Sequence, residues 1–277
     1  MFVQLEKIRL HYQVVGEGKP IIFLHGFFGI SDAMMEIFEP IFENVDGWRR
    51  IYIDAPGNGD SEAPEWVKGS DEILDVVEQF IDHVIPDQNF CLAGWSYGGF
   101  LSLGLIHRRP KQIDGLVLVC PLVEPEEEKR NLPEIKMCKI DDDFLSTLEP
   151  DMQESIKSGT MGLAVCDERV MKRADKIYTP GHQKANRPFL DSIKERGYEY
   201  SFDIFPLPVP FPKPTLILTG RFDNSVGYRD TWKFESQFPR ATFVVLDAAA
   251  HSVPVEQEGI FVVLVKEWIE RLQYYHD

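Results

Sequence analysis

The segment Gly94-Trp95-Ser96-Tyr97-Gly98-Gly99 directly follows the apolar run Phe90-Cys91-Leu92-Ala93. Its pattern is G-x-S-x-G, which between a strand and a helix places the serine on a sharp, strained turn. The serine hydroxyl then stands clear of the fold as a nucleophile. The glycines two residues before and after Ser96 leave out side chains that would crowd this turn. We therefore interpret Ser96 as a candidate nucleophile, provided that the rest of the chain supplies its partners.

Length and composition limit the class of protein. The chain has 277 residues, enough for one large domain or for one domain with an insertion. Hydrophobic residues make up 44% and charged residues 27%, which is ordinary for a soluble globular protein. With 29 basic and 45 acidic residues the formal net charge is −16, a balance that repels nucleic acids and anionic lipid surfaces. We expect a small-molecule substrate, no nucleic-acid or membrane partner, and a monomer or homodimer.

The cysteines and the two chain ends indicate the compartment. The four cysteines, at positions 91, 120, 138 and 166, lack the close spacing of a metal site, so we expect reduced thiols and no metal. Residues 1–10 alternate charged and apolar side chains and lack the apolar core of a signal peptide. The apolar run 260–265 is stopped by Lys266 and Glu267, far short of a membrane span. The sequence predicts a cytoplasmic protein.

Short apolar runs alternate with helix-like segments along most of the chain. The expected strands are 8–15, 21–25, 50–54, 90–93, 115–120, 215–219 and 241–247, and the expected helices are 70–84, 100–109 and a closing helix through 260–272. Strands that are apolar on both faces and separated by helices indicate a mainly parallel sheet with helices on both faces. The predicted fold class is therefore α/β.

This alternation breaks between about residues 122 and 205, where the chain becomes acidic and helical. The stretch opens with Glu124-Pro125-Glu126-Glu127-Glu128, and it ends at a proline-rich run, 205–214, that suits a stiff extended connector. An insertion within a sheet protein has to fold back over the sheet. We expect a core made of residues 1–121 and 206–277, with residues 122–205 as a helical cap (lid) over the carboxyl edge of the sheet.

Two further residues complete a candidate catalytic triad with Ser96. His251 follows the last expected strand, and a histidine with a pKa of about 6.5 can take a serine proton at neutral pH. Asp223 follows the strand 215–219 and can orient that histidine. All three residues come just after the carboxyl ends of strands, where open α/β sheets build their sites. Asp247 is an alternative acid, although it would have to turn back from the last strand.

The loop after the second expected strand suits an oxyanion hole. A tetrahedral intermediate needs two hydrogen-bond donors, and the backbone N–H of Tyr97, directly after the nucleophile, is one candidate. The loop His25-Gly26-Phe27-Phe28-Gly29 supplies the other candidate through the N–H of Phe27. We expect His25 itself to shape the loop and to take no part in proton transfer.

Five motifs in order resemble the α/β-hydrolase superfamily over nearly the whole chain: His-Gly-Phe-Phe-Gly at 25–29, Asp-Ala-Pro-Gly-Asn-Gly-Asp-Ser at 54–61, Gly-Trp-Ser-Tyr-Gly-Gly at 94–99, Gly-Arg-Phe-Asp at 220–223 and Ala-His-Ser at 250–252. The resemblance implies an eight-stranded sheet and a helical cap inserted after strand six. It also implies Ser96 as nucleophile, His251 as base and Asp223 as acid, with no cofactor. A serine at position 96 argues against the dehalogenase branch, which attacks through an aspartate.

These observations favour a serine hydrolase that cleaves a small to medium carboxylic ester through an acyl-enzyme on Ser96. Apolar residues close to the site in sequence suggest an acyl pocket, with Phe28 and Trp95 as candidate substrate contacts. Three alternatives remain open on the same fold. A proline-type aminopeptidase would hold the substrate amine with the carboxylates of Glu124 and 126–128. The others are a C–C bond hydrolase acting on ring-cleavage products and a slow-turnover ligand sensor.

Overall fold

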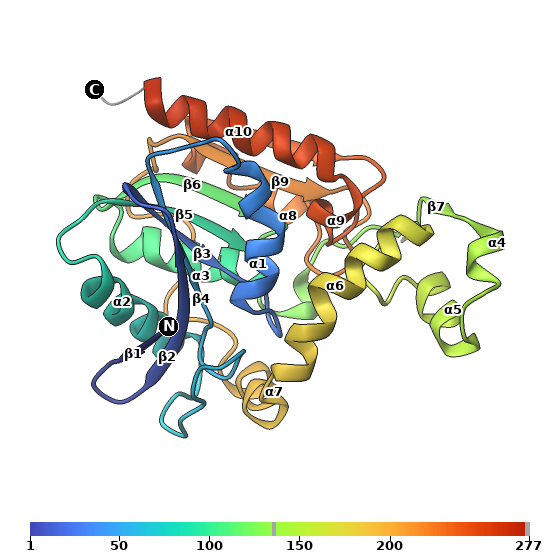
Figure 1. The fold of residues 1–277 in the computed structure, drawn as a ribbon, viewed down its shortest axis with the longest axis horizontal. Coiled ribbons are helices and arrows are strands. Elements are labelled where there is room, and N and C mark those ends of the chain that lie inside the picture. The colour runs from blue at the N-terminus through green and yellow to red at the C-terminus, as the bar shows by residue number, and fades with distance from the viewer. Residues whose placement is uncertain (135–136, 275–277) are drawn as a thin grey trace.

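The computed structural model describes residues 1–134 and 137–274, and an eight-stranded sheet lies at its centre (Figure 1). The strand order is β1-β2-β4-β3-β5-β6-β9-β10. The pairs β1–β2 and β2–β4 are antiparallel, and all other neighbours are parallel. The strands are β1 (Phe2–Gln4), β2 (Arg9–Val15), β3 (Lys19–Leu24), β4 (Trp48–Ile53), β5 (Phe90–Trp95), β6 (Ile113–Val119), β9 (Thr215–Gly220) and β10 (Ala241–Leu246). The predicted eight-stranded, mainly parallel α/β sheet is confirmed.

Helices cover both faces of the sheet (Figure 1). Helices α1 (Ser31–Phe38) and α10 (Glu258–Tyr274) pack on one face, where the rings of Phe38 and Phe261 lie 5.3 Å apart. On the other face lie α2 (Ser70–Val84) and α3 (Tyr97–Arg108). The 70–84 prediction matches α2, whose helical spacing of apolar residues buries one side. Across the described residues, no helix is both long and apolar enough to cross a membrane.

Two sequence expectations differ from the structure. Strand β1 was not predicted, because three residues are too few to show a period of two. Helix α3 begins at Tyr97 and not at residue 100 as expected. The turn at Ser96 is so tight that the helix starts in the next residue, and Gly98 and Gly99, which have low helix propensity, lie inside it.

Between β6 and β9 the chain leaves the sheet, and this excursion contains the segment 122–205 that was predicted as an insertion (Figure 1). The long helix α6 (Glu168–Lys184) contacts both α1 and α9 (Val253–Glu256) of the core. Elements of the described part of this segment are η2 (Glu127–Lys129), β7 (Lys139–Ile140), α4 (Asp142–Leu145), α5 (Pro150–Lys157), β8 (Val165–Cys166), α6 (Glu168–Lys184) and α7 (Arg187–Arg196). The remaining short helices of the core are η1 (Glu39–Ile41), α8 (Arg229–Trp232), η3 (Glu235–Gln237) and α9 (Val253–Glu256). A separate cap domain with these boundaries stays a prediction.

One buried carboxylate, that of Glu256, joins this segment to the core. Its Oε1 accepts the backbone N–H groups of Ala164 and Val165, at 2.5 and 2.9 Å. Its Oε2 accepts the N–H of Ala250 at 2.7 Å, one residue before His251. Burial raises the pKa of Glu256 to about 7, because the protein interior disfavours the charge more strongly than the three N–H groups favour it.

Gly98, on the first turn of α3, has no room for a side chain. A Cβ placed there would lie 1.9 Å from the carbonyl oxygen of Leu24 and 2.7 Å from that of His25. We expect Gly98→Ala to lower the free energy of unfolding in urea by about 1–3 kcal/mol, because backbone has to move to relieve the overlap. Gly259→Ala in α10 is the matched control, since nothing lies within 4 Å of its Cβ position. An equal stability of the Gly98→Ala and Gly259→Ala proteins would contradict this packing.

The raised pKa of Glu256 has a consequence for stability against pH. Folded Glu256 keeps its proton up to about pH 7, whereas an unfolded glutamate loses it near 4.5. The folded state therefore binds more protons in this window, and the stabilising contribution of Glu256 declines as the pH rises through it. Relative to Glu256→Gln, we expect the wild-type free energy of unfolding to fall by up to about 3 kcal/mol between pH 4.5 and pH 7. Urea titrations of both proteins measure this, with Glu270→Gln on the exposed side of α10 as a control that keeps the wild-type slope.

Candidate active site

Ser96 joins β5 to α3 with φ 55° and ψ −115°. This backbone conformation is strained for a residue with a side chain, so the surroundings have to hold it. The N–H of Ser96 donates to the carbonyl of Val119 at 2.9 Å, and its own carbonyl accepts the N–H of Leu122 at 3.1 Å. The last residue of β6 and the segment that follows it therefore hold the turn through both backbone groups of Ser96, at the carboxyl edge of the sheet.

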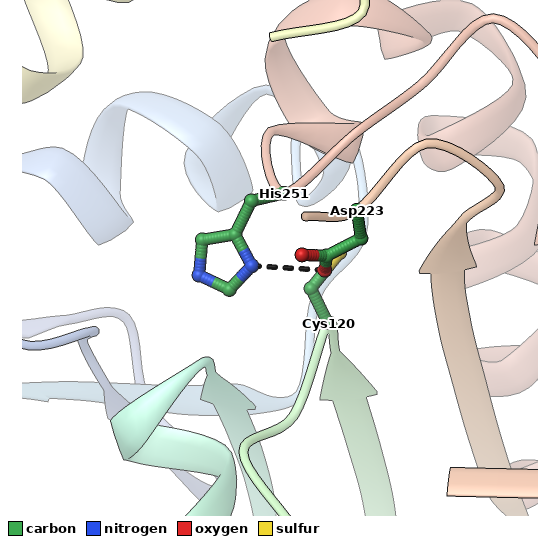
Figure 2. Close-up of side chains that lie close together, drawn as sticks. All are labelled: Cys120, Asp223 and His251. Atoms are coloured by element: carbon green, nitrogen blue, oxygen red, sulfur yellow. Dashed lines mark hydrogen bonds and ion pairs between the residues drawn. The ribbon is translucent and has the colours of Figure 1, made fainter. Parts of the chain in front are cut away.

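His251 and Asp223 come from separate loops at the same edge and form a hydrogen-bonded pair (Figure 2). Nδ1 of His251 lies 2.9 Å from Oδ2 of Asp223, whose side chain is fully buried. The second carboxylate oxygen accepts the N–H groups of Ser225 and Val226 at 2.9 and 3.0 Å. Burial opposes ionisation of Asp223, but His251 and these N–H groups outweigh it and hold the pKa of the carboxyl below its usual range. The carboxylate thus stays charged and directs Nε2 of the imidazole away from itself.

Cys120 is a neighbour of this pair that sequence reasoning missed (Figure 2). The sequence predicts it only as a reduced thiol at the end of the expected strand 115–120. Its Sγ, the Asp223 carboxylate and a His251 ring nitrogen all lie within 4.8 Å of one another, and its backbone has φ 41°. Burial raises the pKa of the Cys120 thiol well above the usual range. These are metal-ligand residue types, and in this structure both Asp223 oxygens and Nδ1 of His251 are engaged in hydrogen bonds. Cys120 directly follows β6, and its positive φ could not be anticipated, because no motif in the sequence marks this position.

Trp95 contacts the backbone of His251. Its indole N–H donates to the backbone carbonyl of His251 at 3.1 Å. The indole ring also packs against the ring of Tyr178 on α6, with centroids 5.6 Å apart. The hydroxyl of Tyr178 in turn hydrogen-bonds that of Ser252. Trp95, predicted as a substrate contact, is therefore also a support of the His251 loop.

The loop after β3 is held by His25. Nδ1 of His25 lies 2.7 Å from the carbonyl of Gly26, and Nε2 accepts the N–H of Ala55 at 3.0 Å. Burial lowers the pKa of His25, and both ring nitrogens are occupied by backbone groups. This agrees with a structural role. A Cβ at Gly26 would lie 3.3 Å from the Cβ of Ser96, so a glycine lets the loop approach the serine closely.

The two residues expected to form the oxyanion hole lie side by side. The rings of Phe27 and Tyr97 are in edge contact, with centroids 5.0 Å apart. Phe28, next in the loop, has φ 62° and contacts the ring of Phe27 at 5.0 Å. The backbone of this loop is therefore held beside the start of α3 by aromatic packing.

A cavity of about 70 Å³ brings most of the predicted site residues together. Its lining includes Gly26, Phe27, Phe28, Trp95, Ser96 and His251. Ile177, Tyr178 and His182 of α6 complete it, and sequence reasoning missed all three. They belong to a helix that carries no motif, so no pattern in the chain singles them out.

The alternative residues lie elsewhere. Asp247 is exposed, and Asp223 and not Asp247 accepts the His251 hydrogen bond. The run 126–128 lines a different cavity, of about 900 Å³, together with Lys68, Lys194 and Tyr198. The predicted acidic run and the predicted nucleophile therefore line separate cavities.

Comparison with known proteins agrees with this geometry. Residues 19–150 match the family model described as alpha/beta hydrolase fold. A pimeloyl-[acyl-carrier protein] methyl ester esterase from Shewanella sp. (strain MR-7) is 25% identical over 275 residues, which cover 96% of each chain. An alpha/beta superfamily hydrolase from Oenococcus oeni PSU-1 superimposes with a TM-score of 0.86 at 25% identity over 99% of both chains. A thermophilic esterase from Thermogutta terrifontis shares the fold, with a TM-score of 0.66 at 20% identity over 96% of this chain and 94% of its own. The chain is an α/β-hydrolase fold protein related to esterases.

Proposed function

We propose that the protein is a serine hydrolase that cleaves small to medium carboxylic esters, with Ser96 as nucleophile, His251 as general base and Asp223 as the orienting acid. One observation carries the proposal: Ser96, on its strained turn, lines the same cavity as His251, whose Nδ1 is bound to a buried carboxylate. The similarity to a curated methyl ester esterase supports an ester as the bond that is cleaved.

Acylation begins when Nε2 of His251 takes the Ser96 proton while Oγ attacks the ester carbonyl carbon. The tetrahedral intermediate collapses, its bond to the alcohol oxygen breaks, and His251 gives its proton to that oxygen. In deacylation a water molecule loses a proton to His251 and attacks the acyl-enzyme. The carboxylic acid leaves, and Ser96 takes the proton back. Asp223 stays ionised and stabilises the imidazolium, in keeping with its lowered pKa.

The intermediate also needs donors for its oxyanion, and we assign this role to the backbone N–H groups of Phe27 and Tyr97. The edge contact between their rings supports the assignment, because it keeps the two residues together without using their amides. Loss of one such donor typically costs about 3 kcal/mol of transition-state stabilisation. Phe28 and Trp95 line the same cavity and are the proposed substrate contacts.

We also propose that residues 122–205 act as a cap. Support comes from Ile177, Tyr178 and His182, which belong to α6 of this segment and line the cavity that holds Ser96. A helix that covers the cavity excludes water from the reacting groups. The bound substrate would accordingly be a small molecule that fits beneath α6.

The aminopeptidase alternative has less support. It requires carboxylates near Ser96 to bind a free amine, but residues 126–128 line the separate cavity with Lys68 and Lys194.

A C–C bond hydrolase would prefer ring-cleavage products over any ester. A slow-turnover ligand sensor would hydrolyse its ligand slowly or only once, and its melting temperature would rise strongly when the ligand binds. Steady-state turnover of p-nitrophenyl acetate, compared with an amino-acyl anilide, separates these possibilities.

Removal of the nucleophile is the direct test of the proposed mechanism. We expect Ser96→Ala to lower the initial rate on p-nitrophenyl acetate by about 10⁴-fold or more, since no acyl-enzyme can form. Ser192→Ala on α7, whose hydroxyl donates to the carbonyl of Phe189, is the control and should keep the wild-type rate. If Ser96→Ala hydrolyses the ester as fast as wild type, Ser96 is not the nucleophile.

Substitution of each candidate acid, Asp223 or Asp247, should have a different effect on kcat. We expect Asp223→Asn to lower kcat by about 10⁴-fold, because an amide neither stabilises the imidazolium nor fixes its tautomer. The exposed Asp247→Asn variant should retain wild-type kcat. The reverse result, a large loss in Asp247→Asn alone, would make Asp247 the acid. Thermal unfolding of both variants shows whether each remains folded.

A further inference from the structure

A second cavity adjoins the first at His251. Its volume is about 550 Å³, several times that of the cavity that holds Ser96 at about 70 Å³. Tyr178, His182 and His251 line both cavities. Ser96 and Phe27 line the small cavity and not the large one. His251 therefore belongs to the wall that the two cavities share.

If the proposed ester hydrolysis holds, this placement indicates which part of the ester binds in each cavity. The carbonyl carbon must reach Oγ of Ser96 and its oxygen must reach the Phe27 loop, so the acyl group belongs on the side of the small cavity. The alcohol oxygen must receive its proton from His251 before it departs. The alcohol therefore leaves past the imidazole, toward the large cavity.

The walls of the small cavity leave little freedom for a long acyl chain. Met34 is fully buried beneath it. The ring of Phe28 stacks on His182 at 5.8 Å and lies under the guanidinium of Arg187 at 5.1 Å. The ring of Phe27 makes edge contacts with both Phe28 and Tyr97 at 5.0 Å. Rings that are packed on several sides cannot swing away without breaking these contacts.

The walls of the large cavity are of another kind. Three methionines line it: Met152 on α5, Met161 between α5 and β8, and Met171 on α6. Methionine side chains are flexible and polarisable, so they adapt to apolar groups of varied shape. Polar side chains line this cavity as well, and several already have partners within the protein. The hydroxyl of Ser252 donates to the carbonyl of Gly162 at 3.1 Å, and the hydroxyl of Thr179 donates to Oδ1 of Asp175 at 2.5 Å.

We propose that the substrate is an ester of a short acyl group with a longer apolar alcohol, the acyl group bound in the small cavity at Ser96 and the alcohol in the methionine-lined cavity beyond His251. This assignment rests on the proposed esterase function. It differs from the methyl esters for which the curated relative is named, whose alcohol is the smallest one.

Hexyl acetate and ethyl hexanoate test the assignment on the wild-type protein. They are isomers with the same unactivated alkyl ester group and differ in which side carries the long chain. We expect kcat/KM, followed by pH-stat, to be at least tenfold higher for hexyl acetate. Equal values or a preference for ethyl hexanoate would overturn the assignment while the esterase function stands. If neither isomer nor p-nitrophenyl acetate is hydrolysed, the esterase function itself fails, and the assignment fails with it.

Variants in each cavity test the same assignment from the protein side. Met161→Trp fills the large cavity, and we expect it to lower the ratio of the hexyl acetate to the ethyl acetate rate at least fivefold. Met152→Trp, at the more exposed end of that cavity, should act in the same direction if Met161→Trp does not fold. Met34→Ala enlarges the small cavity and should raise ethyl hexanoate hydrolysis relative to hexyl acetate. Val263→Trp on the exposed side of α10 is the control for added bulk. Unchanged ratios in the folded cavity variants would contradict the assignment.

Discussion

Close backbone contact at the turn around Ser96 is the constraint on which the rest of the site depends. A Cβ at Gly98 would overlap the carbonyl of Leu24, and a Cβ at Gly26 would press on Ser96. These glycines let α3, the end of β3 and the following loop meet within van der Waals distance. The strained φ of Ser96 then persists because Val119 at the end of β6 accepts its N–H group and Leu122 donates to its carbonyl. Ser96 and the loop that carries Phe27 are thus parts of one packed unit.

Two buried carboxyl groups contact His251 or the residue before it, and their pKa values are shifted in opposite directions. Asp223 faces an imidazole and two N–H groups, which hold its pKa below the usual range despite complete burial. Glu256 accepts three N–H groups and has no cationic side-chain partner within residues 1–134 and 137–274, and burial raises its pKa to about 7. Asp223 therefore acts as a charge directed at the imidazole, whereas Glu256 ties the backbone before His251 to the segment that carries β8.

Helix α6 belongs to the inserted segment and lines both cavities of the proposed substrate site. Tyr178 and His182 line both the cavity at Ser96 and the methionine-lined cavity, so this helix is the shared wall between them. In the proposed reaction the core loops supply the reacting groups, and the rings of Phe27, Phe28 and Tyr97 pack against one another beside them. The insertion supplies Met152, Met161 and Met171, which are adaptable and easily exchanged. Such a division permits a change of substrate without a change in the chemistry at Ser96.

The sequence by itself determined the sheet, most strand positions, helix α2 and the candidates Ser96, Asp223, His251, Phe27 and Tyr97. It could do so because apolar periodicity and the residue types that follow each strand are local properties of the chain. Only the tertiary structure decided that Asp223 and not Asp247 contacts His251, that Cys120 lies against that pair, and that the run 126–128 lines a cavity apart from Ser96. It also decided the two cavities, because their walls join side chains from α1, α5, α6 and three core loops. Such contacts depend on how distant elements pack, and no period or motif in the chain records that.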